Sequence, residues 1–371
     1  MKVCHVINRL SSGGAQQVVC DIVRNAPNVE HTICCLEPSL SCDLEGVNAR
    51  IVELSGRFKF DPLMMIRFRQ FVNNNSFDVL HLHLPYSQIV GRTISTITGV
   101  NRIVSTFHSP PEKFHPLTRT LERITRPRDT VSVAVSKGVQ RANTSNACVY
   151  TGGDPGQWCT IFNGIDVEAF NSKVNREDTN SLEEKYEISD GPVFLNVSRY
   201  IPEKSQRDAI DAMVHVVDEY PSATLFIAGR GPLKNDLRQR VADRGLEDNV
   251  KVPGFVSQEE LYAHYSLSDA FVLSSVSEGF GIVLIEAMAA RLPVVATDIP
   301  GVNEVVSDGE TGRIVPPRSP KSLAAALLKV VETEEQCAAY GAAGYDRALR
   351  LFDARTMADS YTQIYEHVVS N

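Results

Sequence analysis

Short apolar runs that alternate with longer amphipathic stretches set the strongest limit on how this chain can fold. An apolar run of about four to eight residues between turn signals is typical of a strand buried on both faces of a parallel sheet. Such strands, when helices separate them, indicate a doubly wound α/β sheet. The first half of the sequence has these runs at 2–7, 31–36, 50–54, 79–82, 103–106 and 131–134, with a helix predicted at 15–24.

A second series of the same kind follows in the other half of the sequence. A polar, charged segment at 171–190 separates the two series and predicts a linker. We therefore expect an N-terminal domain at 1–170, a second domain at 191–352, and a terminal amphipathic helix within 353–371. The strands of the second series are predicted at 193–197, 224–228, 250–252, 270–273, 294–296 and 313–315, and its helices at 207–219, 233–244, 259–266 and 320–331.

The charge of the chain is divided unevenly between these halves. Its 371 residues carry a net charge of −8, to which residues 1–170 contribute +3 and residues 171–371 contribute −11. An acidic half and a mildly basic half indicate that the two domains meet different partners. Nucleic acid is not expected among them, because no basic stripe interleaved with aromatic residues occurs.

Cysteine usage and hydropathy predict a cytoplasmic protein. Eight cysteines are too few for a disulfide scaffold in a chain of 371 residues, and none has the spacing of a zinc site. Thiols in apolar runs are usually small core residues, which suits a reducing compartment. The N-terminus is too short and polar for a secretory signal, and no apolar stretch approaches the roughly 18 residues of a membrane span.

The segment 277–290, Ser-Glu-Gly-Phe-Gly-Ile-Val-Leu-Ile-Glu-Ala-Met-Ala-Ala, places two carboxylates around a glycine-rich helix start. It lies between two predicted strands, and ligands bind beyond the carboxyl ends of the strands in such sheets. The amides at the helix start suit a phosphate, while Glu278 and Glu286 suit neutral hydroxyls, so the pattern indicates a phosphorylated sugar. Alternatively, Glu286 complements the helix dipole and Glu278 is a solvated loop acid. The amides concerned belong to Gly281, Ile282 and Val283.

This segment resembles the paired-glutamate signature of the retaining nucleotide-sugar glycosyltransferases of family four, with seven residues between the glutamates and Gly-Phe-Gly inside. The resemblance implies the GT-B fold, in which two Rossmann-like doubly wound domains face each other across a cleft. It implies that Glu278 lies by the donor sugar and that Glu286 binds the ribose of the nucleotide. It also implies that the last helix, predicted at 356–369, crosses back to the first domain.

Two basic residues follow the first strand of the second series. Arg199 and Lys204 lie five positions apart on one loop and can both point at one polyanion. The stretch resembles the family's Arg…Glu-Lys motif for the donor diphosphate, although Ser205 replaces the usual glycine; the alternative is two solvated surface bases. Because no Asp-x-Asp pair occurs, we expect no metal and no cofactor, with a nucleotide-diphosphate sugar as the donor substrate.

Glycine-containing turns resemble further donor-binding parts of the family. The turn around Gly229 and the segment with Phe255 and Val256 resemble the walls of the nucleobase site, although a Gly-x-Gly stretch often serves to close a turn. In the loop Ser12-Gly13-Gly14, the amides of Gly13 and Gly14 stand at a helix start and suit an anion. The resemblance implies that this loop lies near the donor phosphate and the acceptor. Its spacing differs from the Gly-x-Gly-x-x-Gly of nicotinamide enzymes.

Histidines stand at the ends of two strands in the first series. His108 follows the strand at 103–106, and the resemblance implies that it touches the donor sugar and supports the transition state; a histidine at the edge of the core is the alternative. Alternation puts His81 and His83 on one face of their strand, and His83 is a weaker candidate for the acceptor side. We do not expect a metal there, because the sequence offers no third ligand at a telling spacing.

A basic amphipathic segment at 113–128 predicts peripheral contact with an anionic membrane. It carries five Lys and Arg residues against one acid, with apolar residues at roughly helical spacing. The stretches 58–60 and 64–69 are also basic and apolar. The alternative is that these are ordinary helices packed on the sheet.

Two classes of function remain open. The first is a retaining, metal-independent glycosyltransferase that moves a sugar from a nucleotide-diphosphate sugar to an acceptor hydroxyl, in lipid-linked or cell-surface glycan synthesis. The second is a GT-B nucleotide-sugar epimerase or a non-catalytic nucleotide-sugar-binding protein. The intact set of charged and histidine residues favours the enzyme, with His108 and Glu278 as its catalytic residues. The sugar, the base and the acceptor are not specified by any motif.

Overall fold

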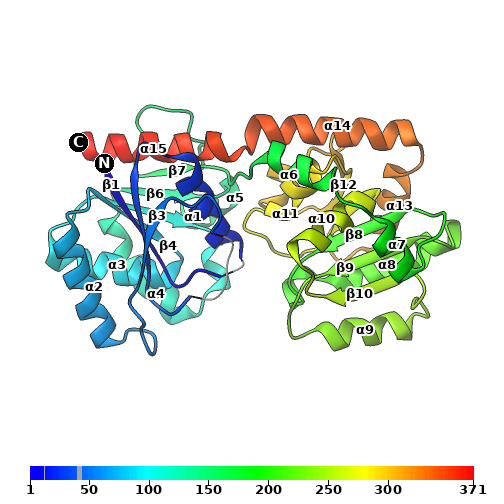
Figure 1. The fold of residues 1–371 in the computed structure, drawn as a ribbon, viewed down its shortest axis with the longest axis horizontal. Helices are drawn as coiled ribbons and strands as arrows, with labels where there is room; N and C mark the ends of the chain where they lie inside the picture. The colour runs from blue at the N-terminus through cyan, green and yellow to red at the C-terminus, as the bar shows by residue number, and fades with distance from the viewer. Residues whose placement is uncertain (12, 40–43) are drawn as a thin grey trace. The chain divides into compact units, whose positions relative to one another are not determined.

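The computed structural model describes residues 1–11, 13–39 and 44–371 of the chain. Ser12, from the predicted glycine loop, and Cys42, one of the thiols, lie outside the described residues. The chain forms two compact units, one of Met1–Gly164 with Asp353–Asn371 and the other of Ile165–Phe352 (Figure 1). Among the helices of the described residues, none has the length and apolar composition needed to cross a membrane.

The first unit is a seven-stranded parallel sheet with helices on both faces (Figure 1). Its strand order, β3-β2-β1-β4-β5-β6-β7, is doubly wound, as the sequence predicts. The strands are β1 (Lys2–Ile7), β2 (Glu30–Cys35), β3 (Ala49–Glu53), β4 (Val79–His83), β5 (Ile103–Phe107), β6 (Val131–Ala134) and β7 (Trp158–Thr160). The helices are α1 (Gly14–Asn25), α2 (Pro62–Asn75), α3 (Pro85–Thr98), α4 (Pro116–Thr125), α5 (Lys137–Asn143) and α15 (Ala354–Ser370), with 3₁₀ turns at Pro111–Lys113 and Arg126–Arg128.

Side chains alternate between two layers along the strands of this sheet. On β1, Cys4 and Val6 join the core formed with α2 and α3, whereas Ile7 joins the core formed with α1. His5 lies on the same face as Ile7, and its ring is 5.1 Å from that of His81 on the neighbouring strand β4. Because a helix layer covers each face, the strands are apolar almost throughout.

The last helix, α15, belongs to the first unit although it follows the second in the sequence. It packs against α1 and β4, and its Tyr361 and Tyr365 are fully buried. Asp353 caps the helix, because its side chain accepts a hydrogen bond of 2.9 Å from the amide of Arg355. The first unit therefore contains both ends of the chain.

A buried arginine ties helix α4 to the first sheet. Arg92 of α3 is fully buried, and its guanidinium donates to Asp129 at 2.7 and 2.6 Å and to Glu122 of α4 at 2.9 Å. Two carboxylates around one guanidinium satisfy a charge that would otherwise be costly to bury. This network leaves the opposite face of α4 exposed to solvent, where Leu117 and Ile124 lie.

The second unit is a six-stranded parallel sheet with the order β10-β9-β8-β11-β12-β13. Its strands are β8 (Val193–Val197), β9 (Thr224–Ala228), β10 (Val250–Gly254), β11 (Ala270–Leu273), β12 (Val294–Thr297) and β13 (Gly312–Val315). Its helices are α6 (Val167–Val174), α7 (Asn180–Tyr186), α8 (Gln206–Glu219), α9 (Lys234–Asp243), α10 (Gln258–Leu267), α11 (Ile282–Ala289), α12 (Val302–Val305), α13 (Pro320–Val330) and α14 (Glu334–Leu351), with a 3₁₀ turn at Pro202–Lys204. Helices α8 and α13 cover one face, and α6, α10 and α11 cover the other.

The segment 171–190, predicted as a linker, is not an extended connection. It contains the end of α6 and all of α7, and it belongs to the second unit, which begins at Ile165. Its polar residues lie on the exposed faces of these short helices, whereas Val174 and Leu182 are buried. Three buried residues in α6 and one in α7 leave too weak a periodic pattern for sequence analysis to detect.

Candidate functional site

The second sheet reverses its strand order between β8 and β11, and this is where its charged residues gather. Strands β9 and β10 extend from one side of β8, and β11, β12 and β13 extend from the other. At such a switch point the loops after the two central strands diverge, which opens a crevice at the carboxyl edge of the sheet. Arg199 and Lys204 lie on the loop after β8, and Glu278 lies on the loop after β11.

Lys204 and Glu278 form an ion pair across the switch point. Lys204 Nζ donates to Glu278 Oε1, which also accepts a hydrogen bond of 2.9 Å from Ser275 Oγ. Their side chains are 15% and 9% exposed, so the pair is largely shielded from water. The predicted phosphate-binding base and the predicted sugar-binding acid are therefore neighbours, although they are 74 positions apart in the sequence.

Ser205 occupies the position after Lys204 where the family usually has glycine. Its φ of 45° lies in the left-handed region, which glycine adopts more easily than serine. The serine hydroxyl donates a hydrogen bond of 2.8 Å to Asp208 of α8, which compensates in part for the backbone conformation. The turn is therefore preserved despite the substitution.

The backbone around Arg199 is held rigidly while its side chain is exposed. Gln206, which is buried, donates 2.7 Å and 2.8 Å hydrogen bonds to the Arg199 carbonyl and to Ser198 Oγ. Gly229, with a φ of 148°, lies so close to Ser198 that a Cβ atom there would overlap the Ser198 carbonyl. This explains the glycine by packing between the β8 and β9 loops. The fixed loop leaves the Arg199 guanidinium exposed beside the switch point.

The glycine-rich loop after β11 leads directly into α11. Gly281 is the N-cap of this helix and has a φ of 89°, which favours glycine. The amides of Ile282 and Val283 form the first turn and lie at the carboxyl edge of the sheet, half-buried. Backbone N–H groups at a helix start have no partner within the helix and attract anions.

Glu286 is oriented by a buried tyrosine that sequence analysis missed. Tyr265 of α10 donates a hydrogen bond of 2.9 Å to Glu286 Oε2. Burial, together with the Glu286 charge, raises the pKa of Tyr265 well above its usual value, so the hydroxyl remains a donor at neutral pH. Tyr265 and Glu286 are 21 positions apart on different helices, and no local motif connects them.

Phe255 and Val256 lie beyond β10, on the far side of β9 from Arg199 and Lys204. Phe255 is 68% exposed, and the guanidinium of Arg230 lies over its ring at 5.4 Å. Phe255 and Val256 border a pocket of about 520 Å³. An exposed aromatic ring with a stacked guanidinium is a suitable platform for a planar base.

The first unit holds the predicted glycine loop and His108. Gly13 is the N-cap of α1 and Gly14 its first residue, and both are exposed at the carboxyl end of β1. His108 follows β5 and is half-buried. Burial lowers the pKa of His108 to about 4, so its imidazole is neutral at physiological pH.

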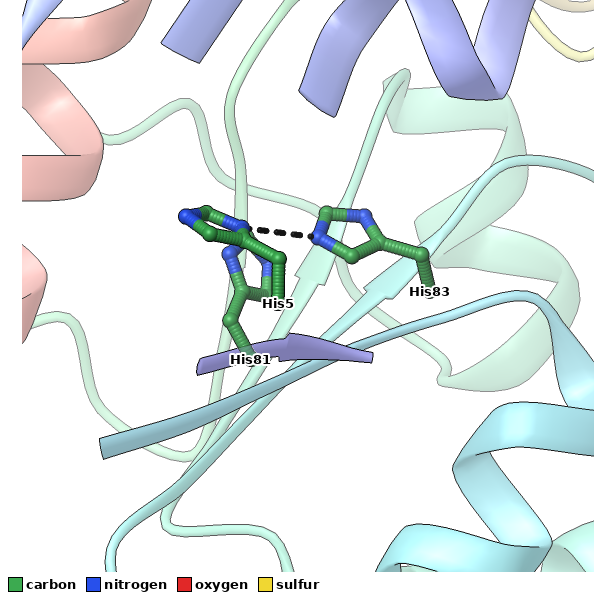
Figure 2. Close-up of side chains that lie close together, drawn as sticks. All are labelled: His5, His81 and His83. Atoms are coloured by element: carbon green, nitrogen blue, oxygen red, sulfur yellow. Dashed lines mark hydrogen bonds between the residues drawn. The ribbon is translucent and has the colours of Figure 1, made fainter. Parts of the chain in front are cut away.

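Three more histidines lie beside His108 in the first unit. His81 and His83 of β4 lie on one face, as alternation predicts, and their ring centroids are 3.9 Å apart. Figure 2 shows how His5 of β1 faces them, with the Nδ1 of His5 directed at the Nε2 of His83, 3.3 Å away. One ring nitrogen from each of His5, His81 and His83 lies within 4.8 Å of the others. No sequence pattern predicts this third histidine, because His5 precedes His81 by 76 positions.

Comparisons with known proteins identify the family of the chain. Residues 12–169 match the family described as Glycosyltransferase Family 4, and residues 178–347 match the family described as glycosyl transferases group 1. The phosphatidyl-myo-inositol mannosyltransferase of Mycobacterium tuberculosis is 30% identical over 329 residues, which cover 85% of this chain and 80% of that protein. The alpha-D-kanosaminyltransferase of Streptomyces kanamyceticus is 37% identical over 154 residues, which cover 42% of this chain and 40% of the relative.

A solved structure shows the same fold at lower sequence identity. The crystal structure of Anabaena Alr3699/HepE in complex with UDP-glucose has a TM-score of 0.82, with 22% identity and 100% of each chain covered. The two doubly wound sheets, the family matches and the named relatives together define a GT-B glycosyltransferase that uses a nucleotide-sugar donor. The chain belongs to glycosyltransferase family 4.

Proposed function

We propose that the protein is a retaining, metal-independent transferase that moves a hexose from a nucleotide-diphosphate sugar to an acceptor hydroxyl. The observation that carries the proposal is the arrangement at the switch point of the second sheet. There Lys204 contacts Glu278, and Arg199 lies on the same loop as Lys204. Two cations on one loop suit the diphosphate, and the carboxylates of Glu278 and Glu286 suit hydroxyls of the sugar and the ribose.

The same residues account for each part of the transfer. Arg199 and Lys204 stabilise the negative charge that develops on the leaving diphosphate. Glu278 holds hydroxyls of the donor sugar, while the neutral ring of His108 supports the sugar without adding a positive charge of its own. A diphosphate oxygen accepts the proton of the acceptor hydroxyl as the acceptor attacks from the departing face. No separate protein base is required, and the anomeric configuration is retained.

The names of two relatives support a lipid-linked alcohol as the acceptor. One relative is named as a phosphatidyl-myo-inositol mannosyltransferase and covers most of the chain. Another, from Mycobacterium tuberculosis, is named as a GDP-mannose-dependent mannosyltransferase that acts on phosphatidylinositol monomannoside, with 32% identity over 188 residues. We therefore place a mannose-type donor and a phosphoinositide-type acceptor first among the substrates to be tested.

The product anomer tests the proposal directly. A thermal-shift screen against UDP-, GDP- and ADP-sugars identifies the donor by its stabilisation of the protein. Transfer from that α-linked donor is expected to give an α-linked product, detected by NMR of the anomeric proton. A β-linked product would contradict the retaining assignment, and hydrolysis or epimerisation without transfer would contradict the transferase itself.

Chelation is expected to leave the activity unchanged. Since Arg199 and Lys204 supply the positive charge at the diphosphate, no divalent ion is needed to neutralise the leaving group. Initial rates measured after dialysis against EDTA should match untreated enzyme within experimental error. A rate that disappears in EDTA and returns with Mg²⁺ or Mn²⁺ would show that the two cations are insufficient.

We further propose that the first unit contacts an anionic membrane at two places. Leu117 and Ile124 of α4 are 62% and 69% exposed, beside the exposed bases Arg119 and Arg123. These two arginines and Ile124 line a hollow of about 700 Å³. Exposed apolar side chains surrounded by arginines are typical of a helix that lies in the lipid interface.

The second place precedes and includes the start of α2. Phe58, Leu63 and Ile66 are 62%, 55% and 53% exposed in a segment that also contains four bases. These bases are Arg57, Lys59, Arg67 and Arg69. In the described part of the second unit, Phe255 is the exposed large apolar residue, and that unit carries most of the negative charge of the chain. Membrane contact is thus expected from the first unit.

Vesicle co-sedimentation checks this proposal with matched variants. Wild-type protein should sediment with anionic vesicles, and less so as salt increases. Leu117→Ser with Ile124→Ser, and separately Phe58→Ser with Leu63→Ser, should each reduce binding several-fold, since each removes exposed apolar contact. Ile97→Ser is the control, because Ile97 is 52% exposed on α3 without adjacent bases in the sequence. Equal sedimentation of all four proteins would show that these exposed residues do not contact the membrane.

A further inference from the structure

A continuous row of hydrogen-bonded histidines crosses four adjacent strands of the first sheet. His31 Nδ1 lies 3.0 Å from His5 Nε2, His5 Nδ1 lies 3.3 Å from His83 Nε2, and His83 Nδ1 lies 3.4 Å from His108 Nε2. His31, His5 and His83 lie in β2, β1 and β4, and His108 directly follows β5; these four strands are neighbours in the sheet order. Each inner ring thus uses both of its nitrogens to contact another histidine.

One backbone carbonyl fixes the direction of every hydrogen bond in this row. His31 Nε2 lies 3.1 Å from the carbonyl oxygen of Ala26, the residue that ends α1. A carbonyl oxygen can only accept, so His31 carries its proton on Nε2 and its Nδ1 must accept from His5. A neutral imidazole has one donor and one acceptor. His5 therefore carries its proton on Nε2, as do His83 and His108 in turn.

This assignment requires every ring in the row to be neutral, and burial makes them so. Burial lowers the pKa of His5 and His83 well below the usual value of histidine, and the neighbouring histidines lower both further. Burial also lowers the pKa of His31, although its hydrogen bond to Ala26 acts in the opposite direction. A second proton on His31, His5 or His83 would place two donors face to face.

His81 lies beside the row but is not part of it. Its Nδ1 is 2.6 Å from the hydroxyl of Tyr365, and its Nε2 is 2.8 Å from the hydroxyl of Thr106. Thr106 is in turn 3.0 Å from the hydroxyl of Tyr361. Hydroxyls both donate and accept, so they stabilise His81 in either tautomer. The row and the hydroxyl cluster together satisfy the ring nitrogens of these buried histidines.

We propose that His31, His5 and His83 are positioning residues that hold His108 as the Nε2–H tautomer and leave its Nδ1 as an acceptor for a hydroxyl of the donor sugar. Among the described residues, the Nδ1 of His108 has no hydrogen-bond partner. The inference rests on the proposed role of His108 at the donor sugar. It adds that the acceptor character of this nitrogen is set by Ala26, three histidines away.

The fixed tautomer matters for the transfer. A lone pair at Nδ1 accepts a hydrogen bond from a sugar hydroxyl and directs partial negative charge toward a sugar that becomes positive. The opposite tautomer would present an N–H donor to the same sugar. The row also conflicts with metal binding at His5, His81 and His83, because His83 Nε2 carries a proton that points at His5 and offers no lone pair to an ion.

Long-range ¹H–¹⁵N NMR of histidine-labelled protein tests the tautomers without any assay of activity. His31, His5, His83 and His108 are all expected to show the Nε2–H pattern at pH 7.5, with signals assigned from single His→Gln variants. A Nδ1–H or rapidly exchanging pattern at His108 in the wild type would overturn the proposal. Metal detected in the purified protein, with His signals that change on EDTA treatment, would also overturn it in favour of a metal site.

A pair of substitutions at the far end of the row supplies the functional readout. His31→Asn keeps an acceptor where Nδ1 stood, whereas His31→Leu removes it. In His31→Leu we expect His108 to populate both tautomers and kcat to fall roughly 10-fold, with a small change in KM for the donor. His31→Asn should restore the Nε2–H pattern and most of kcat. Equal kcat for the two variants, both folded by circular dichroism, would contradict the proposal.

The two levels of inference fail separately in these experiments. If the wild type transfers no sugar but shows four Nε2–H histidines, the proposed function fails and the row remains. If transfer with retention occurs and His108 is not Nε2–H, the row fails and the proposed function remains.

Discussion

Replacing Lys204 with alanine is expected to lower kcat/KM for the nucleotide sugar by about 30- to 1,000-fold, equivalent to about 2–4 kcal/mol of transition-state stabilisation. Lys204 is the more buried of the two bases at the switch point, and it contacts Glu278 directly. Charge-assisted contacts to a diphosphate are strongest where water is excluded. Arg199→Ala should also lower kcat/KM, because Arg199 stabilises charge on the same leaving diphosphate.

Matched variants separate this effect from a general loss of positive charge. Arg207 is exposed at the start of α8 and forms a long ion pair of 3.8 Å with Asp236. Arg207→Ala removes one positive charge close to Lys204 in the sequence and should change kcat/KM by less than about twofold, since exposed pairs contribute little. If Lys204→Ala and Arg207→Ala behave alike, while both remain folded, Lys204 does not bind the diphosphate.

Lowering the pH from 7.5 to 5.5 is expected to destabilise the first unit by about 4 kcal/mol through His5, His81 and His83. All three are fully buried, and burial is the main cause that lowers the pKa of each well below the usual value. The unfolded chain takes up a proton near pH 6.5 at each site, whereas the folded chain does not. The free energy of unfolding is therefore highest above pH 6.5. It falls by about 1.4 kcal/mol for each histidine as the pH is lowered from 7.5 to 5.5.

The single tryptophan of the chain makes this measurement specific to the first unit. Trp158 lies in β7, so urea unfolding followed by its fluorescence reports on that sheet. His5→Gln should lose about 1.4 kcal/mol of the pH dependence, whatever its effect on stability at pH 7.5. Asp129, whose pKa is raised by burial, is common to both proteins and cancels in the difference. An identical pH dependence in wild type and variant would contradict the prediction.

Sequence patterns predicted the strands better than the helices between them. The predicted strand at 193–197 matches β8, and those at 2–7 and 131–134 match β1 and β6, because apolar runs bounded by turns are distinctive. β7 was missed, since three residues at Trp158–Thr160 are too few to form a pattern. α14 was also missed, because its Ala- and Gly-rich sequence has a weak apolar stripe.

Residues of the candidate site were predictable where they lie in local motifs. Glu278, Arg199 and Lys204 each stand on a loop that directly follows a predicted strand, and the structure places those loops at one edge of the second sheet. Glu286 lies in α11, the helix that the loop of Glu278 enters. Tyr265 escaped prediction because a tyrosine in a helix is ordinarily part of the core. Nothing local distinguishes it from Tyr262, which precedes it on the same helix.

The histidine row could not be inferred before the strand register was known. Pairing sets Val3 beside His31 and His5 beside His81, and a shift of one residue would turn His5 to the opposite face. Histidines on separate strands carry no sequence signal that joins them. Only the register of β2, β1, β4 and β5 shows that these histidines lie close together.

The return of α15 to the first sheet has a consequence for how the protein is made. On the ribosome, residues 1–164 emerge well before Tyr361 and Tyr365, which cover the buried histidines. The second unit lies wholly between these two parts and can close its own core as soon as it is synthesised. The N-terminal sheet is translated first, but one of its faces stays without the cover of α15 until the entire second unit has been translated. In this protein the order of synthesis is the reverse of the order in which the two cores can be completed.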